Sequence, residues 1–226
     1  RFPEPKQTPS SPLLQETSTL FRLALPLMGT QIAQMGMGLL DTIMAGRYSA
    51  LDLAGVALGS SILWPLMLLV MGLIAAVTPT VSQLNGSKNY KEIGEVIRQG
   101  LWIALIGGLL ISVILNQIGF VYALLDVDPK ARPISIAYLQ MTSLGLPAVT
   151  CFFCLRFLAE GMNFTKPALY IAVCGLLLKA PLNYILIYGK FGFPEMGGVG
   201  CGIAQAIIAW FQLIAITIVV TRPRFD

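Results

Sequence analysis

The chain has 226 residues, of which 56% are hydrophobic and only 12% are charged, and its formal net charge is +4. Soluble domains carry about twice this share of charged residues. The composition therefore excludes an ordinary soluble domain and predicts an all-α integral membrane protein. The chain contains no histidine, which argues against zinc hydrolysis and Ser-His-Asp catalysis. We expect neither an enzyme nor a protein that binds a cofactor or nucleic acid.

The N-terminal segment RFPEPKQTPSSPLLQE is rich in proline and serine, and it lacks the apolar core of a signal peptide. We interpret residues 1–18 as a disordered cytosolic tail. Residues 19–221 then form the membrane domain, and residues 222–226 begin a linker to a further part of the protein.

The membrane domain contains six segments that are apolar enough to cross a bilayer, which takes about 20 residues. In chain order they cover residues 20–48, 53–84, 93–125, 134–160, 168–188 and 200–221. The loops between them hold Gly, Pro or Asn residues, which interrupt helices. Membrane helices also tolerate internal prolines when neighbours satisfy the freed backbone groups. The prolines inside these predicted runs are Pro65, Pro79, Pro147 and Pro181.

The positions of lysine and arginine predict the orientation, because these residues are enriched in cytosolic loops. Ten of them fall on one side of the six spans: Arg1, Lys6, Arg22, Lys88, Lys91, Arg98, Arg156, Lys166, Arg222 and Arg224. Four fall on the other side: Arg47, Lys130, Arg132 and Lys190. Both ends of the chain lie on the more positive side, as an even number of spans requires. We therefore expect both to be cytosolic.

Two ionisable residues, Asp41 and Lys179, lie inside predicted spans. Each costs about 2.5–3.5 kcal/mol at the centre of a bilayer, and such residues usually mark functional sites. An acid is also a poor choice for joining helices in hydrocarbon. Asp41 is therefore the first candidate for a functional residue, and Lys179 is a candidate counter-charge.

Polar side chains share helix faces with these two charges. One face of the first span contains Thr30, Gln34, Met37, Gly38, Asp41, Ala45 and Tyr48. Lys179 and Asn183 lie one turn apart in the fifth span, and Gln205 and Gln212 lie two turns apart in the sixth. The simplest arrangement points all three faces at one internal cavity. The alternative is that these groups only join helices through hydrogen bonds of about 1 kcal/mol each.

Two further patterns have structural interpretations. Arg156 and Glu160 are four residues apart near the cytosolic end of the fourth span, which predicts an interfacial salt bridge and a candidate gate. The run GGVGCG at residues 197–202 lacks the preceding strand of a phosphate-binding loop. It therefore predicts close packing between helices.

Three stretches resemble the multidrug and toxic compound extrusion transporters of the NorM type. They are PLMGTQIAQMGMGLLDTIMAG (residues 26–46), RFLAEGM (156–162) and KAPLNYILIYGKFGFPEMGGVGCGIA (179–204). The resemblance runs in order from about residue 20 to residue 221. It implies that the chain is the N-terminal half of a twelve-helix transporter of the bacterial inner membrane, whose C-terminal half is its partner. It also implies export of cationic or amphiphilic drugs by antiport with H⁺ or Na⁺, and a monomer at full length.

The same resemblance implies where the coupling ion acts. By motif match, the coupling site falls on Asp41 and on the amide of Asn183, without any resident metal beyond a coupling Na⁺ at Asp41. We expect the substrate cavity to be lined by the polar faces named above, through Thr30, Gln34, Met37, Tyr184, Gln205 and Gln212. The sequence leaves open whether Tyr184 faces this cavity or lipid.

Lys179 departs from the family pattern, because NorM-type members generally have asparagine at this position. A protonated lysine has no lone pair to offer to Na⁺. We expect Lys179 to pair with Asp41, to take the place of a bound cation and to favour H⁺ as the coupling ion. The alternative is that its side chain extends to the membrane interface and contacts neither residue.

Two other functions stay open on the sequence alone. A flippase for lipid-linked oligosaccharides would favour a cationic cavity, which a single lysine beside an acid fits poorly. A membrane scaffold without transport activity would use the same polar groups only to join helices, and it would not depend on the charge of Asp41.

Overall fold

A computed structural model describes residues 12–124 and 128–221 of the chain. This part of the chain folds into nine α-helices without a β-strand. They are α1 (Pro12–Tyr48), α2 (Ala50–Ala75), α3 (Val77–Gly86), α4 (Tyr90–Asn116), α5 (Ile118–Leu124), α6 (Arg132–Ser143), α7 (Leu146–Gly161), α8 (Lys166–Tyr188) and α9 (Gly198–Val220). The predicted linker at 222–226 and residues 1–11 of the predicted tail lie outside the described residues. The helix α1 already begins within the range predicted as tail.

Each predicted span corresponds to one helix or to a consecutive pair of helices. The first, fifth and sixth spans are α1, α8 and α9, whereas the other three are the pairs α2–α3, α4–α5 and α6–α7. The break between α6 and α7 bends the span by 52°. Pro65 and Pro181 lie within unbroken helices, and Pro147 lies in the first turn of α7, where a missing backbone N–H costs little.

The length and apolarity of the helices confirm a membrane-spanning bundle. Four segments of the described chain meet both criteria alone: Ala50–Gly86, Tyr90–Asn116, Lys166–Tyr188 and Gly198–Val220. The bent pair α6–α7 makes five when it is counted as one span. The helix α1 completes the six-helix bundle, and polar residues such as Gln31, Gln34 and Asp41 interrupt its apolar sequence.

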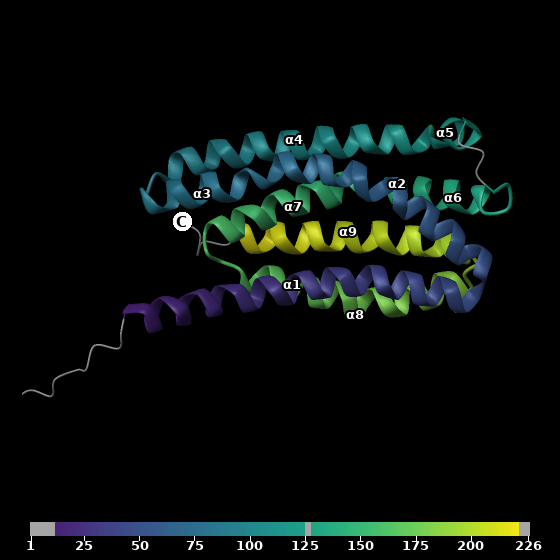
Figure 1. Cartoon of the computed structure of the whole chain (residues 1–226), viewed down its shortest axis with the longest axis horizontal. Coiled ribbons are helices and arrows are strands. Elements are labelled where there is room, and N and C mark those ends of the chain that lie inside the picture. Colours follow the sequence, from purple (N-terminus) through teal and green to yellow (C-terminus); the bar gives the residue numbers. More distant parts are fainter. Residues whose placement is uncertain (1–11, 125–127, 222–226) are drawn as a thin grey trace, which may run out of the picture.

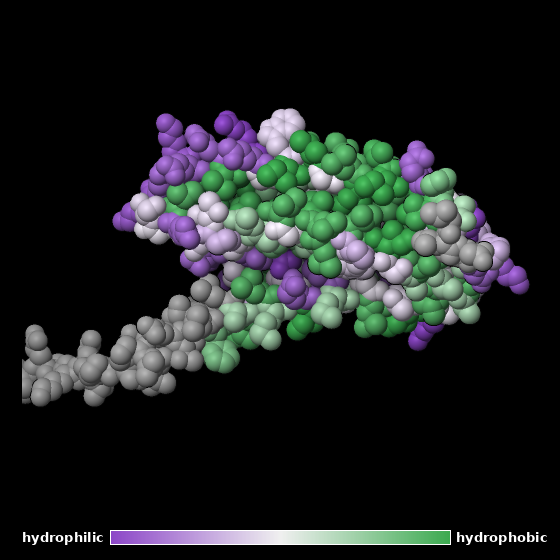
Figure 2. Space-filling view, turned by 45° about the horizontal axis from the view of Figure 1, so that its top comes forward, coloured by the Kyte–Doolittle hydropathy of each residue, from purple (hydrophilic) through white to green (hydrophobic). Residues whose placement is uncertain are grey.

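The surface of the bundle matches this assignment. Large apolar side chains are exposed along several helices, for example Met35 at 76%, Leu69 at 70% and Leu177 at 67%. Figure 2 shows a broad hydrophobic face across the middle of the molecule, with hydrophilic side chains gathered towards both ends. A soluble monomer rarely exposes so much contiguous apolar area, whereas lipid solvates it.

The helices run along one common direction, and α9 lies in the middle of the bundle (Figure 1). It packs against α6, α7 and α8, while α1 packs along α8 and α2. The start of α1, the α3–α4 turn, the α7–α8 connection and the end of α9 lie together at one end of the bundle (Figure 1). Among the described residues, Lys88 lies in the α3–α4 turn, Lys91 lies in the first turn of α4, and Lys166 begins α8. The fold therefore brings these positive residues to one end of the bundle.

Two hydrophobic clusters follow one another along the bundle. One contains Ala45, Ile187 and Cys201, and the other contains Ile171 and Ile216. Asp41 precedes Ala45 in α1, and Lys179 falls between Ile171 and Ile187 in α8. The intramembrane charges therefore lie between the two clusters, near the middle of the bundle.

Close packing at the bend between α6 and α7 depends on Gly145. A Cβ atom at this position would lie 2.6 Å from the Cα atom of Ala206 in α9. Because that contact is with the backbone, α9 itself would have to move. We expect Gly145→Ala to lower the free energy of unfolding by about 1–3 kcal/mol, measured as thermal unfolding in detergent. The control is Gly72→Ala in α2, whose added methyl meets nothing within 4 Å and should cost nothing. Equal losses in both variants would contradict this packing.

Candidate functional site

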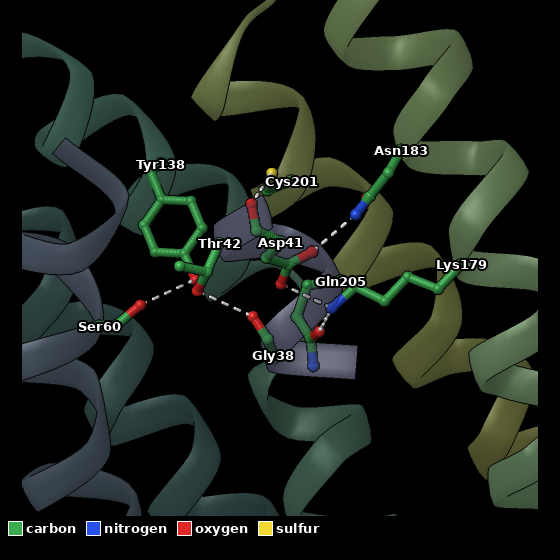
Figure 3. A network of polar contacts seen from close by, with 9 residues as sticks. All are labelled: Gly38, Asp41, Thr42, Ser60, Tyr138, Lys179, Asn183, Cys201 and Gln205. Atoms are coloured by element: carbon green, nitrogen blue, oxygen red, sulfur yellow. Dashed lines mark hydrogen bonds and ion pairs between the residues drawn. The ribbon is translucent and has the colours of Figure 1, made fainter. Parts of the chain in front are cut away.

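Lys179 reaches into the bundle rather than to the membrane interface. Its side chain is fully buried, and its Nζ donates hydrogen bonds to Asp41 Oδ2 at 2.7 Å and to Gln205 Oε1 at 2.5 Å. Figure 3 shows the three side chains converging from α8, α1 and α9. The expected pairing of Lys179 with Asp41 is therefore present, and the alternative of an interfacial lysine does not hold for this structure.

Asp41 is held through both of its carboxylate oxygens. Asn183 Nδ2 donates a hydrogen bond to Oδ1 at 2.8 Å, and Lys179 Nζ donates one to Oδ2. Asn183 is fully buried and Asp41 is 6% exposed. Both donors come from α8, where their spacing of one turn places them on the same face. The carboxylate thus bridges α1 to two successive turns of α8.

Further groups of the network lie around this carboxylate (Figure 3). The Cys201 Sγ lies 3.9 Å from the backbone oxygen of Asp41. The Tyr138 side chain, from α6, interacts electrostatically with Asp41, and its hydroxyl lies 3.5 Å from Ser60 Oγ. The sequence prediction missed Tyr138 and Ser60, because a single hydroxyl in an apolar run gives no signal of its partner.

The glycines at the start of α9 allow the close approach that this network needs. A Cβ at Gly200 would lie 2.9 Å from the carbonyl carbon of Leu186, and one at Gly202 would lie 2.7 Å from the carbonyl oxygen of Tyr138. The run GGVGCG therefore serves helix packing, as predicted. It brings α9 against α8 and α6, so that Gln205 can reach Lys179.

The first turn of α9 is also fixed from α2. The backbone N–H of Gly198 donates to Asp52 Oδ1 at 2.6 Å. A carboxylate suits this place because the first N–H groups of a helix lack intrahelical acceptors. Gly197, with φ of 55°, takes a left-handed backbone that favours glycine. Asp52 was not among the predicted site residues, although it directly precedes the second predicted span.

Most of the other predicted cavity residues do not contact the charged pair. Thr30 is buried, and its hydroxyl donates to the Pro26 carbonyl of its own helix at 2.8 Å. Met37 is buried one turn from Asp41. Gln34 and Gln212 each have an Nε2 atom without a hydrogen-bond partner.

Gln212 and Tyr184 lie in two different surroundings. The amide of Gln212 packs against Gly175, where an added Cβ would lie 2.7 Å from its Nε2. The Tyr184 side chain is 48% exposed, and its ring lies 5.4 Å from that of Tyr188. The polar face of α9 is therefore divided, because Gln205 belongs to the charged network whereas Gln212 lies elsewhere along α8.

A second polar cluster surrounds Arg156 in α7. Its Nε donates to Glu160 Oε1 at 2.7 Å, which confirms the predicted salt bridge. The structure adds a hydrogen bond of 2.8 Å to Gln31 Oε1 in α1, and the guanidinium lies 5.6 Å from the centre of the Phe153 ring. The sequence did not reveal this contact, since Gln31 lies 125 residues away. The cluster ties α1 to α7 independently of Asp41.

The described residues contain no group of three or more His, Cys, Asp or Glu side chains that could hold a metal ion. At the charged site, the ammonium of Lys179 stands where a cation would neutralise Asp41. Because Asp41 accepts from α8 and Lys179 also donates to Gln205, a change in the charge of the carboxylate would alter the contacts between α1, α8 and α9.

Because Lys179 and Asp41 neutralise each other, removing the lysine alone should destabilise the protein more than removing both charges. Lys179→Met leaves the carboxylate of Asp41 buried without its counter-charge. We expect a loss of about 3–5 kcal/mol in unfolding free energy, as for other broken buried pairs. Adding Asp41→Asn should recover most of that loss, because the unpaired charge is removed with it. Thermal unfolding of the two single variants and the double variant in lipid nanodiscs measures this coupling. Additive losses would contradict a direct ion pair.

Comparison with known proteins identifies the family. The MatE family model matches residues 26–185. The chain is 43% identical over 210 residues to the multidrug resistance protein MdtK of Yersinia pestis (strain Pestoides F), covering 92% of this chain and 46% of that protein. It is 42% identical over 211 residues to the multidrug resistance protein NorM of Vibrio cholerae, covering 93% and 46% respectively. The chain thus spans about half the length of these relatives.

Solved structures share the fold at lower sequence identity. The eukaryotic MATE transporter AtDTX14 has a TM-score of 0.85 and 20% identity, over 93% of this chain and 46% of that one. A MOP superfamily transporter from Pyrococcus furiosus has a TM-score of 0.80 and 21% identity, over 90% and 44%. These structures show the fold, whereas the family model covers well over half of the sequence. The chain therefore belongs to the MatE family of multidrug and toxic compound extrusion transporters, which are not enzymes.

Proposed function

We propose that this chain is the N-terminal half of a secondary active multidrug exporter that is driven by H⁺. In this proposal, cationic or amphiphilic drugs leave the cell as protons enter. The choice of ion rests on one observation: Lys179 Nζ lies 2.7 Å from Asp41 Oδ2, and the lysine side chain is fully buried. The likeness to proteins named for multidrug resistance supports the choice of substrate class.

The geometry favours H⁺ over Na⁺ for a chemical reason. A sodium site needs several oxygen ligands, and a protonated lysine offers only donors. Lys179 and Asn183 already occupy the two oxygens of Asp41. A sodium ion would have to displace the ammonium, whereas a proton needs only to reach the carboxylate. Protonation would neutralise Asp41 and remove the attraction that holds α1 to α8.

This change supplies the step that antiport requires. Loss of the ion pair would weaken the link between α1 and α8, and a cationic drug in the same cavity would lose its attraction to Asp41. The protein would alternate between a form with a charged Asp41, which retains the drug, and a protonated form, which releases it. A complete cycle needs this bundle to rock against a second bundle, and the binding site lies near the bilayer midplane.

The proposed setting follows from the same orientation and family arguments. We infer a multi-pass protein of the bacterial inner membrane, with both ends of this segment in the cytosol and residues 222–226 leading to the C-terminal half. The full-length transporter would act as a monomer. The α3–α4 turn, which contains Lys88, and the α7–α8 connection, which precedes Lys166, lie at the same end of the bundle (Figure 1), and this supports the orientation.

Efflux from proteoliposomes tests the coupling ion. The full-length transporter should export a fluorescent cation under an imposed pH gradient and should not respond to a Na⁺ gradient at constant pH. Lys179→Asn removes the built-in ammonium, so we expect this variant to gain a response to Na⁺. The matched control Lys190→Asn changes an exposed lysine in the α8–α9 connection and should behave as the wild type.

Three outcomes would contradict the proposal. Na⁺-driven efflux by the wild type at constant pH would show that Lys179 does not replace the ion. Unchanged efflux by Asp41→Asn would favour a role of Asp41 in joining helices, as in the scaffold alternative. Transport of a lipid-linked pyrophosphate in place of cations would favour the flippase.

A further inference from the structure

We propose that Gln205 is a positioning residue for the coupling reaction, which holds the ammonium of Lys179 when Asp41 becomes protonated. This inference rests on the proposed function and assigns a distinct role to Gln205 within it. The observation is that the lysine has two acceptors of different kinds. Asp41 Oδ2 is a charged acceptor, and Gln205 Oε1 is a neutral one on a different helix.

The need for a second acceptor follows from burial. Lys179 has no solvent exposure, so its ammonium cannot turn to water when it loses the Asp41 carboxylate. An uncompensated buried charge is strongly unfavourable. The protonated state of Asp41 is therefore accessible only when another group accepts from the ammonium. Gln205 Oε1, at 2.5 Å from Nζ, is already in place to do so.

Of the other groups around the pair, Asn183 has a buried Oδ1 atom without a hydrogen-bond partner, but among the described side chains only Asp41 and Gln205 accept from Lys179 Nζ. The remaining neighbours make other contacts. From α6, Tyr138 interacts with Asp41, and its hydroxyl is placed near Ser60 of α2. From α9, Cys201 approaches the backbone oxygen of Asp41. The other acid near α9, Asp52, accepts from the backbone of that helix at its N-terminus.

Gln205 is also suited because its amide cannot titrate. A carboxylate in its place would keep the lysine permanently paired and would change the charge of the site. The amide oxygen retains the ammonium without competing for the proton. Asp41 is then the member of the triad whose charge changes, while the ammonium keeps the hydrogen bond that it already makes to Gln205.

The test measures how protonation of Asp41 depends on pH. Infrared difference spectra of the full chain in lipid nanodiscs report the carbonyl stretch of a protonated carboxyl group, and its loss in Asp41→Asn assigns the band. We expect Gln205→Leu to move the midpoint of Asp41 protonation to lower pH by roughly one unit. The variant removes the hydrogen bond from Lys179, and this loss destabilises mainly the state in which Asp41 is protonated. More protons are then needed to reach that state.

A second variant reverses the sign. Gln205→Glu places an anion beside the lysine and near Asp41, so the midpoint of Asp41 should move to higher pH. The band of the introduced carboxyl group is identified in the double variant with Asp41→Asn. The matched control Gln83→Leu removes an exposed amide from α3 and should leave the midpoint unchanged. A purely structural role of Gln205 would not predict opposite shifts for the two variants.

The results separate this inference from the proposed function. Opposite shifts of the midpoint in Gln205→Leu and Gln205→Glu support a positioning role. A wild-type midpoint in both variants, or shifts in the same direction, would overturn that role and leave H⁺ coupling through Asp41 in place. The proposed function itself would be overturned if the wild type showed no infrared band of protonated Asp41 at any pH from mildly acidic to mildly alkaline.

Discussion

The buried contact between Lys179 and Asp41 is the constraint that the rest of the structure satisfies. Two charges removed from water are tolerated only when they meet at hydrogen-bonding distance and when their remaining bonds are also made. Asn183 supplies one of these bonds and Gln205 supplies another. Three helices must therefore come together at one level of the bundle, and α9 can do so because glycines rather than larger residues face α8 and α6 near its start.

The helix α1 is held at two separate levels. It is tied to α8 through Asp41 and, nearer its start, to α7 through the hydrogen bond between Gln31 and Arg156. These two residues of α1 are ten positions apart, which corresponds to about 15 Å along a helix. Both links are polar and partly or fully buried. Each link therefore fixes the position of α1 against a different neighbouring helix.

The sequence predicted the bundle well, because long apolar runs and intervening breakers are strong signals. It did not predict the breaks at Ala76 and Gln117. The apolar run continues through Ala76, and Asn116 and Gln117 are only two polar residues between longer apolar runs. The pairing of Lys179 with Asp41 was predictable, because each charge needs a partner in hydrocarbon. The bond between Gln31 and Arg156 was not, because it depends on how α1 crosses α7. For the same reason, helical periodicity grouped Gln205 with Gln212, and only the packing of α8 against α9 separates them.

A tethered ammonium differs from a bound metal ion in ways that bear on coupling. It cannot diffuse away, so its effective concentration at the carboxylate is far above that of any ion in solution. A dissolved cation therefore has two ways to act: it can displace the ammonium from Asp41, or it can bind while the ammonium stays in the site. In the proposed mechanism sodium would do the first, because it would compete with Lys179 and Asn183 for the oxygens of Asp41. A proton can do the second, because it binds the carboxylate itself and leaves the lysine to a neutral acceptor. Under the proposed coupling to H⁺, the lysine would thus make the site selective for protons over other cations.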